Sequence, residues 1–317
     1  MVWALVDDRP GNASQCLGVA EALGLGFQVK DLTYRAAGAL PNAALGASFV
    51  GLTAASREGL TPPWPDVVVA AGRRTGPVAR QIKRLSGGAA LLAQIMFPGR
   101  PGIAEYDLVS VPHHDRVAAR PNVMRITGAP HRVTEQALRE AAAEWQGRLG
   151  GLPRPRIALM VGGSTRRRRF TEAMARQLGG AANALAATAG GALLVSTSRR
   201  SGPAAAAALV AEITVPSHIY RWGDGGDNPY AGYLGTADAV IVTGDSVSMC
   251  SEACTTPGPV YIYAPEALTA PKHGRFHQGL FEGGYARPLA GRLEEWRHES
   301  LNAAHDIARE IRRRIGA

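Results

Sequence analysis

Short runs of apolar residues recur along the whole chain, and most of them end in a turn rich in Gly, Asp, Ser or Pro. Such brief runs of Val, Ile, Leu and Ala are typical of strands buried on both faces of a parallel sheet. We predict strands at residues 2–6, 65–71, 90–95, 107–111, 123–127, 156–161, 192–196, 237–242 and 259–263.

The segments between these runs carry apolar residues three or four positions apart, which is the period of an amphipathic helix. We predict helices at residues 14–23, through Ala79, Ile82 and Leu85, and at 133–147, 171–189 and 204–211. Strands that alternate with helices indicate the α/β class, with parallel sheets covered by helices on both faces.

The order of elements restarts after residues 150–155, which read Gly-Gly-Leu-Pro-Arg-Pro and predict a linker. The 317 residues also exceed the roughly 250–300 at which one hydrophobic core usually stops growing. We therefore predict one α/β domain at 1–150 and a second at 151–290. Within 291–317 we expect a basic amphipathic helix from Leu293 to Ile315 that packs back on the first domain. A helix lying on a membrane surface is the alternative.

The composition is 46% hydrophobic and 19% charged, which excludes a disordered chain. The net charge of +9 suits a phosphate-bearing partner, whether nucleotide, anionic lipid or nucleic acid. No run approaches the roughly 18 apolar residues that cross a bilayer, and the N-terminus lacks the pattern of a signal peptide. We expect a cytoplasmic protein, with peripheral contact at an anionic inner membrane as an option.

Metal binding has two candidate patterns, and neither is complete. Cys250 and Cys254 have no second cysteine pair to join them, so we interpret them as small residues on a helix face. His273 and His277 have the spacing of two ligands on a helix, but no carboxylate or third histidine lies nearby in the sequence. We expect no bound metal.

The turn after the strand at 237–242 is the most informative candidate site. Ligands of open parallel sheets bind where the carboxyl ends of the strands deliver loops with free N–H groups. Gly244, Asp245, Ser246 and Ser248 form a turn of the right polarity for a phosphate. Glu252 follows in the next helix, where it either accepts hydrogen bonds from ribose hydroxyls or is an ordinary exposed glutamate.

Four further segments of the second domain lie at the same predicted edge. The turn with Gly163, Ser164 and Thr165, followed by four arginines at 166–169, is a second candidate phosphate loop. It has neither a Walker motif nor a dinucleotide fingerprint. The other candidate donor-binding residues are Ser198 and Arg199, Asn228 and Tyr230, and Lys272. Tyr230 either packs near a base or lies in a plain turn, and Lys272 with His273 suggests a basic lip over a phosphate.

The loop after the first strand is the candidate catalytic segment of the first domain. A carboxylate there, Asp7 or Asp8, is either a general base for an acceptor hydroxyl or a helix cap. The neighbouring candidate acceptor-binding residues are Arg9, Gly11, Asn12, Gln15, Arg73 and Arg74.

Four segments together resemble one protein family. Residues 8–12 (Asp-Arg-Pro-Gly-Asn), 162–164 (Gly-Gly-Ser), 243–249 (Thr-Gly-Asp-Ser-Val-Ser-Met) and 251–253 (Ser-Glu-Ala) resemble the bacterial proteins grouped with the plant mitochondrial-fission Elm proteins. The resemblance extends over nearly the whole chain, and 245–249 is its most specific part. It implies a GT-B glycosyltransferase architecture, with two Rossmann-like domains facing a cleft.

The resemblance also implies roles for individual residues. Ser164, Thr165, Ser246 and Ser248 would meet the diphosphate of a nucleotide-sugar donor, Glu252 its ribose, and Asp8 would be the base. Such enzymes typically use no metal or other cofactor, because helix N-termini and basic side chains stabilise the leaving nucleoside diphosphate. A sugar-epimerase label attached to the family disagrees with this sequence. An NAD-dependent epimerase would need a Gly-rich dinucleotide loop and a Tyr-x-x-x-Lys pair, and both are absent.

We thus expect a glycosyltransferase that moves a sugar from a nucleotide-diphosphate sugar to an envelope lipid or glycan acceptor. The alternative is a non-catalytic scaffold at a membrane surface, as the fission role of the plant relatives suggests. A specific nucleic-acid partner is not expected, because the arginines are dispersed among phosphate-type loops and no nucleic-acid-binding motif is present.

Overall fold

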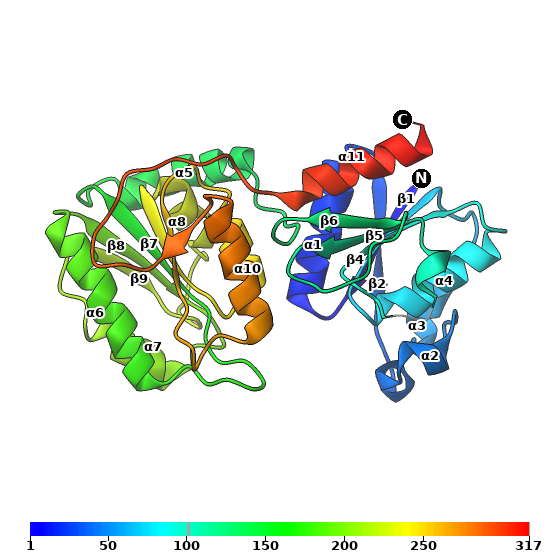
Figure 1. Cartoon of the computed structure of the whole chain (residues 1–317), viewed down its shortest axis with the longest axis horizontal. Coiled ribbons are helices and arrows are strands. Elements are labelled where there is room, and N and C mark those ends of the chain that lie inside the picture. The colour runs from blue at the N-terminus through cyan, green and yellow to red at the C-terminus, as the bar shows by residue number, and fades with distance from the viewer. Residues whose placement is uncertain (100–101, 317) are drawn as a thin grey trace. The chain divides into compact units, whose positions relative to one another are not determined.

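Two six-stranded sheets, each entirely parallel, carry the fold in the computed structural model, which describes residues 1–99 and 102–316 (Figure 1). Each sheet belongs to a separate unit. The first unit comprises residues 1–132 together with the C-terminal segment from Ala303, and the second comprises 133–302. The predicted α/β class is therefore confirmed for both halves of the chain.

The sheet of the first unit has the strand order β2-β1-β3-β4-β5-β6. Successive residues of its central strand point to opposite faces: Val67 and Val69 enter one apolar cluster, and Val68 enters the other. Helices α1 and α11 cover the first face and α4 the second. The strands are β1 (Val2–Asp7), β2 (Phe27–Leu32), β3 (Val67–Ala71), β4 (Leu91–Ile95), β5 (Leu108–Pro112) and β6 (Val123–Ile126). The helices are α1 (Pro10–Ala22), α2 (Asn42–Leu45), α3 (Ala54–Glu58), α4 (Thr75–Leu85) and α11 (Ala303–Ile315), with 3-10 turns η1 (Ala36–Ala39) and η2 (Ile103–Glu105).

The second unit repeats this construction with the order β12-β11-β10-β7-β8-β9. Its central strand alternates in the same way: Ala158 and Met160 face one apolar cluster, and Leu159 faces the other. The strands are β7 (Arg156–Val161), β8 (Ala192–Thr197), β9 (Ser217–Tyr220), β10 (Ala239–Thr243), β11 (Val260–Tyr263) and β12 (Arg287–Pro288). The helices are α5 (Glu135–Leu149), α6 (Glu172–Thr188), α7 (Pro203–Val210), α8 (Tyr230–Thr236), α9 (Val247–Ala253) and α10 (Pro271–Glu282).

Helix α5 lies in the second unit, whereas the sequence placed it before the linker and in the first domain. Leu138, Trp145 and Leu149 of α5 enter the same buried cluster as Tyr233 of α8. The division between the units therefore falls at 132/133 rather than after 150. The apolar face of α5, which the sequence does show, carries no information about which sheet it covers.

The C-terminal helix begins ten residues later than expected. Residues 293–302 have no regular secondary structure and belong to the second unit, and only Ala303–Ile315 is helical. Ile307 and Ile311 of α11 are buried in the apolar cluster of the first unit that also includes residues of α1. Helix α11 is thus part of the first unit. Among the described helices of either unit, none combines the length and the apolarity that crossing a bilayer requires.

Candidate functional site

Three loops of the second unit are joined to one another where β7, β8 and β10 end. The N–H of Gly162 donates to the hydroxyl of Thr243 at 2.7 Å, and the N–H of Gly163 donates to the Asp245 carboxylate at 3.1 Å. The same carboxylate oxygen pairs with Arg200 at 2.6 Å. Asp245 therefore holds the three loops together from a side chain that has no solvent-exposed surface.

The two glycines after β7 permit this close contact. A Cβ on Gly162 would lie 2.6 Å from both carboxylate oxygens of Asp245, and one on Gly163 would lie 2.2 Å from the Arg200 carbonyl oxygen. Gly163 also has φ +137°, which other residues rarely adopt. The predicted phosphate loop thus needs glycine first for its own packing against the neighbouring loops.

Several predicted donor-binding hydroxyls already have partners within the protein. Ser198 donates to the carbonyl of Gly162, and Ser164 accepts from the N–H of Phe170 at 3.0 Å. Ser246 caps α9 by accepting the N–H of Met249 at 3.4 Å. By contrast, the half-buried side chains of Thr165 and Ser248 have no hydrogen-bond partner among residues 1–99 and 102–316. Those two hydroxyls are available to a ligand.

Glu252 is held by a tyrosine rather than standing free on its helix. The hydroxyl of Tyr230 donates to Glu252 Oε2 at 2.6 Å, and Asn228 accepts the backbone N–H of Tyr230 at 3.1 Å as α8 begins. Burial raises the pKa of Glu252, and the bond from Tyr230 opposes that rise. The structure therefore places Tyr230 behind the carboxylate and fixes which oxygen of Glu252 is already engaged.

His277 of α10 borders the same edge. His277 is buried, and its Nε2 lies 2.9 Å from the carbonyl oxygen of Gly244, to which it donates. Burial is the main cause that lowers the pKa of His277 to about 4, so the ring is neutral at pH 7. A Cβ on Gly244 would meet this ring at 2.5 Å. Lys272, one of the predicted donor contacts, is exposed at the start of α10.

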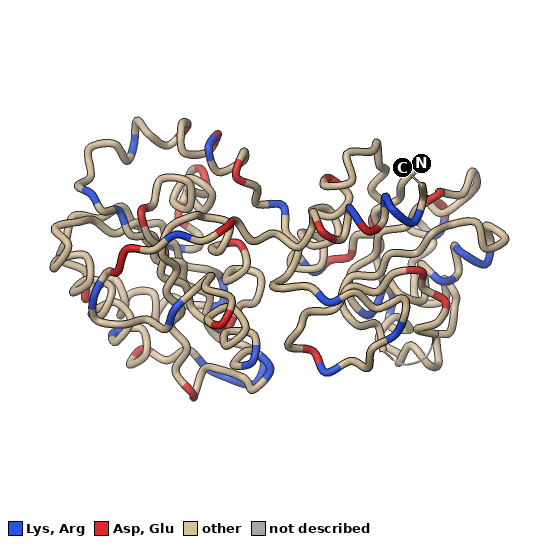
Figure 2. The backbone as a smooth tube through the Cα atoms, turned by 45° about the horizontal axis from the view of Figure 1, so that its top comes forward, with Lys and Arg blue, Asp and Glu red and all other residues tan. Residues whose placement is uncertain are grey.

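The arginines at 166–169 form a continuous basic stretch at the tip of the loop between β7 and α6 (Figure 2). Arg168 donates to the carbonyl oxygen of Glu266 at 2.8 Å, which ties this loop to the one after β11. A cavity of about 640 Å³ lies between the two loops. Arg199, a predicted donor contact on the neighbouring loop, is exposed and has no partner within the described part of the chain.

At the carboxyl edge of the first sheet, the two candidate bases differ in environment. Asp7 has no exposed side-chain surface, and it accepts from Arg74 at 3.1 Å and from Asn12 at 3.2 Å. Asp8 is 72% exposed and pairs with the same Arg74. The backbone N–H of Arg9 also donates to Asp7 at 3.2 Å. Asp7 is therefore a structural carboxylate, and Asp8 is the one that a solvent-borne acceptor can reach.

The predicted acceptor-binding residues divide into held and open side chains. Arg73 donates to the carbonyl of Leu40 at 2.6 Å and to Asn42 at 3.2 Å, so its guanidinium already has partners. Gly11, Asn12 and Gln15 lie in α1, which begins at Pro10 rather than at the predicted residue 14, so Gly11 and Asn12 are helical and not in a loop. Arg9 and Gly11 are exposed, while Gln15 is buried and its Oε1 has no partner in the described part of the chain.

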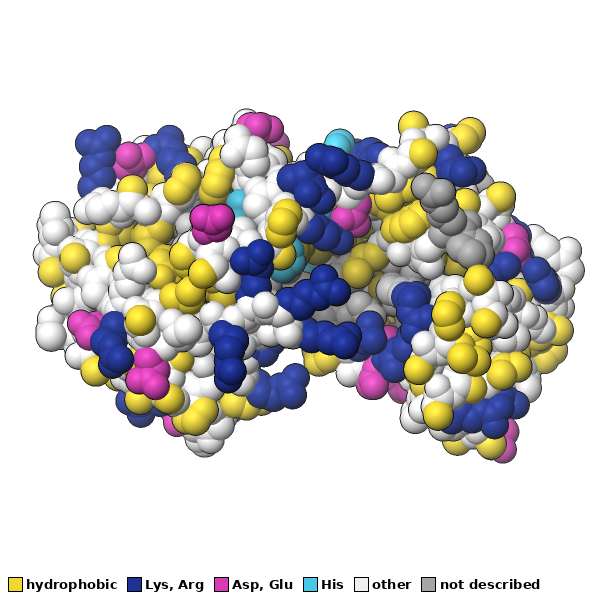
Figure 3. Space-filling view, turned by 60° about the horizontal axis from the view of Figure 1, so that its bottom comes forward, with side chains coloured by type: hydrophobic (Ala, Val, Ile, Leu, Met, Phe, Trp, Pro, Cys, Tyr) yellow, Lys and Arg dark blue, Asp and Glu magenta, His cyan; other side chains and the backbone are white. Residues whose placement is uncertain are grey.

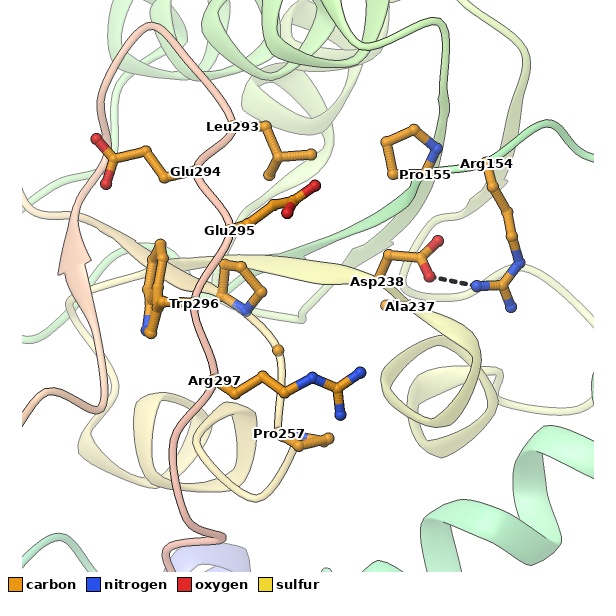
Figure 4. Close-up of a pocket in the computed structure, with 12 residues that line it drawn as sticks. Arg154, Pro155, Ala237, Asp238, Pro257, Leu293, Glu294, Glu295, Trp296 and Arg297 are labelled. Carbon is orange, nitrogen blue, oxygen red and sulfur yellow. Dashed lines mark hydrogen bonds and ion pairs between the residues drawn. The ribbon is translucent and has the colours of Figure 1, made fainter.

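A second cavity of about 750 Å³ lies at the opposite end of the second sheet. It is lined by residues that precede strands, among them Pro155 before β7 and Asp238 before β10. Figure 4 shows Arg154 paired with Asp238 on one side, and the segment with Trp296 on the other. None of the predicted site residues lines this cavity, so it is separate from the candidate site.

The contacts of Thr243, Arg200 and His277 within the site could not be predicted from the sequence, although Thr243 stands in the candidate turn and His277 was considered with His273 as a metal ligand. Each of the three makes a contact with a glycine or a carboxylate that is 33 to 81 positions away in the sequence. The only sequence indication was their position within the same turns as the predicted residues. Arg199 was preferred over Arg200, although Arg200 is the one that binds Asp245.

Comparisons with known proteins agree with this architecture. A family model described as "Mitochondrial fission ELM1" matches residues 10–315. The chain is 29% identical over 299 residues to "Mitochondrial fission protein ELM1" of Arabidopsis thaliana, covering 86% of this chain and 69% of that protein. It is 26% identical over 346 aligned positions to "Uncharacterized protein RP120" of Rickettsia prowazekii, covering 98% and 97%.

Solved structures show the same fold at low sequence identity. The UDP-GlcNAc 2-epimerase of Methanocaldococcus jannaschii has a TM-score of 0.56 and 10% identity, with 100% of this chain and 99% of that chain covered. The UDP-GlcNAc 2-epimerase of Neisseria meningitidis has a TM-score of 0.52 and 11% identity, with 99% and 91% covered. The fold likeness confirms the predicted GT-B architecture of two Rossmann-like α/β domains.

Proposed function

This chain belongs to the mitochondrial fission ELM1 family, and we propose from its fold and its candidate site that it is a GT-B glycosyltransferase whose second unit binds a nucleotide-diphosphate sugar. The proposed reaction transfers the sugar to an envelope lipid or glycan acceptor at the cytoplasmic face of the membrane. A protein of the same fold supports the proposal that the donor is a nucleotide-sugar. The UDP-GlcNAc 2-epimerase of Methanocaldococcus jannaschii, whose TM-score with this chain is 0.56, was solved in complex with UDP-GlcNAc and UDP.

The observation that carries the proposal is the set of open polar groups around a rigid turn. Asp245 and Thr243 fix the backbone of Gly162 and Gly163, while the hydroxyls of Thr165 and Ser248 keep their hydrogen-bonding capacity. We assign these two hydroxyls to the donor diphosphate. Preorganised donors of this kind stabilise a leaving nucleoside diphosphate without a metal, because they need no reorganisation as negative charge develops.

Glu252 is the proposed ribose ligand. Oε2 is engaged by Tyr230, so Oε1 remains to accept hydrogen bonds from the ribose hydroxyls. Asn228 and Tyr230 then act by positioning Glu252 and the start of α8, rather than by stacking on a base. Arg199 and Lys272 are exposed cations at the same edge and serve as outer contacts to the phosphates.

Asp8 is the proposed general base. Its side chain is exposed and pairs with Arg74 at the protein surface, where an acceptor hydroxyl can approach it. Arg9 is the proposed acceptor contact next to it, because its side chain is exposed and has no partner in the described structure.

The test incubates the purified protein with a panel of nucleotide-sugars and with membrane lipids as acceptors. Turnover is measured as release of the nucleoside diphosphate, and the products are then identified. We expect one donor to be consumed, and Asp8→Asn to lower kcat by about 10²- to 10⁴-fold, the usual contribution of a general base. Asp7→Asn, which removes a structural carboxylate, should lower stability first. The missing dinucleotide loop excludes only an NAD-dependent epimerase, so the products are also examined for an epimerised donor.

A non-catalytic scaffold at a membrane surface is the second candidate, and the family name favours it. A scaffold of this kind would turn over no donor, although it can still bind one. Sedimentation with vesicles of anionic and of neutral lipid checks the membrane contact. Arg312 and Arg314 of α11 donate to backbone carbonyls of the first unit, so only the outer face of that helix is open to lipid.

A further inference from the structure

The cavity between the arginine loop and the start of α10 has an unusual polar lining. Its polar residues are Thr165, Arg166, Arg167, Arg168 and His273, and the remaining lining residues are apolar and come from the loop before α10 and from Pro271, the first residue of that helix. Within the described part of the chain, no Asp, Glu, Asn or Gln lines this cavity. On the space-filling surface, Lys and Arg side chains with His among them are visible on one face (Figure 3).

The arginines supply donors and no acceptors. A guanidinium carries five N–H donors and accepts nothing. One nitrogen of Arg168 already donates to the backbone carbonyls of Glu266 and Ala267. Arg166 and Arg167 are exposed and have no hydrogen-bond or ion-pair partner among residues 1–99 and 102–316. A neutral sugar presents hydroxyls that donate as well as accept, whereas a carboxylate or a phosphate only accepts and matches this lining.

The surroundings strengthen the positive potential of the cavity. Helix α10 starts here at Pro271 without a side-chain cap, so its partial positive charge is directed to the cavity. His273 is half-buried, and its Nδ1 is buried without a partner among the described residues. Burial, followed by the nearby cations Lys272, Arg200 and Arg168, lowers the pKa of His273, although Asp245 opposes this shift. His273 thus adds to this lining a ring whose Nδ1 no described residue engages.

The cavity adjoins the proposed nucleotide site. Thr165 follows directly on the turn of Gly162, Gly163 and Ser164, and His273 lies one helical turn before His277, which bonds Gly244. A ligand whose diphosphate lies on these turns would thus extend its next group toward Arg166 and Arg167.

We propose that this cavity binds an anionic group, a carboxylate or a phosphate, next to the nucleotide diphosphate, with Arg166 and Arg167 as its ligands. The inference rests on the proposed nucleotide site. The anion has two possible sources: the transferred sugar, if it is a uronic acid, or the acceptor, if it carries a phosphate. In both cases the arginines bind a group other than the nucleoside diphosphate, either the sugar attached to it or the acceptor.

The test compares affinities by calorimetry for the full chain. The probes are UDP, UDP-GlcNAc, UDP-glucuronate, and glycerol 3-phosphate added alone or to UDP-saturated protein. The test variant is Arg166→Ala with Arg167→Ala. The control variant is Arg139→Ala with Arg176→Ala, which removes two exposed arginines of the same unit outside this cavity. Circular dichroism confirms that both variants are folded.

Two results support the inference. If the sugar carries the anion, the parent binds UDP-glucuronate at least about tenfold more tightly than UDP-GlcNAc, because charge-assisted bonds are the strong ones. The test variant then loses that preference while its affinity for UDP changes less than about threefold. If the acceptor carries the anion, UDP-saturated parent binds glycerol 3-phosphate and the test variant does not. The control variant behaves like the parent in both cases.

Other results overturn it. If the test variant loses affinity equally for UDP, UDP-GlcNAc and UDP-glucuronate, the arginines bind the diphosphate instead. The anion site is also rejected if the parent and the test variant bind every probe with the same affinity. Failure of the parent to bind any of the three nucleotides would instead reject the nucleotide site. Glycerol 3-phosphate added alone then still decides whether the cavity takes an anion.

Discussion

The carboxyl edges of the two sheets are built alike but use their polar residues differently. In the first unit, Arg74 pairs with Asp7 and Asp8, and Arg73 donates to backbone carbonyls and Asn42, so most charged groups satisfy one another. In the second unit, one buried carboxylate, Asp245, joins three loops. Around it, the hydroxyls of Thr165 and Ser248 and the guanidinium groups of Arg166, Arg167 and Arg199 have no partner in the described structure.

The difference suggests a division of labour between the sheets. An edge whose charges neutralise one another offers few groups to a polyanion, whereas an edge with fixed backbone and spare donors is ready to bind one. We therefore place the nucleotide in the second unit and the acceptor chemistry in the first. Changes at the second edge should alter nucleotide affinity, and changes at the first should not.

Gly163→Ala should have the largest effect, because it breaks the junction of the loops. The new Cβ would approach the Arg200 carbonyl oxygen to 2.2 Å at a φ of +137°. Overpacking and backbone strain together should lower the free energy of unfolding by about 4 kcal/mol. Urea denaturation measures this loss. Gly180→Ala in α6, where a Cβ meets nothing within 4 Å, should instead be neutral or stabilising.

Asp245→Asn should have the second-largest effect on stability. It keeps the shape of the side chain but removes the charge that pairs with Arg200 and accepts from Gly163. We expect a loss of about 2–3 kcal/mol in the free energy of unfolding, since Arg200 is partly exposed and can turn to solvent. UDP affinity should fall as well. An unchanged urea midpoint would show that Asp245 does not join the loops.

Acid should weaken the second unit through His277. Its pKa is about 4 in the folded protein, against about 6.5 in an unfolded chain. The unfolded state therefore binds the proton more readily, and stability is lost as the pH falls from 6.5 toward 4. The loss between pH 7.5 and pH 5 should be about 2 kcal/mol. His277→Gln retains a donor for Gly244 and should remove most of this pH dependence in urea titrations at the two pH values.

Arg74→Ala should have the smallest effect and sharpen the comparison. It removes one of the partners of Asp7, which keeps Asn12 and the N–H of Arg9. The free energy of unfolding should fall by about 1–2 kcal/mol. The Kd for UDP should stay within about twofold of the parent value. A large change in that Kd would show that the first edge takes part in nucleotide binding.

The sequence predicted the buried strands well, because strands covered on both faces are continuous apolar runs. It missed β2 (Phe27–Leu32), β9 (Ser217–Tyr220) and β12 (Arg287–Pro288), which are edge strands with partly or fully exposed, partly polar sequences. It also extended the last helix back to Leu293. Leu293 and Trp296 are spaced like helix positions, yet they lie on a segment without regular secondary structure and pack against the second sheet.

The candidate site was predicted as a set of turns, but not in its internal bonding. The turn with Asp245 suggested a ligand contact, and the structure shows a buried carboxylate bound to Gly163 across 82 positions of sequence. Tyr230 suggested either a contact near a base or a plain turn, and the structure shows that its hydroxyl donates to Glu252. Contacts of this length depend on how the strands are ordered in the sheet, which local patterns do not contain.

The binding of UDP to Glu252→Ala, compared with the parent and with Glu282→Ala on the exposed end of α10, tests the nucleotide site most directly. Hydrogen bonds from ribose to a carboxylate are worth about 1.5–3 kcal/mol. The Kd measured by calorimetry should therefore rise about 10- to 100-fold for Glu252→Ala and stay unchanged for Glu282→Ala. Equal affinity in all three proteins would contradict a nucleotide site at the carboxyl edge of the second sheet.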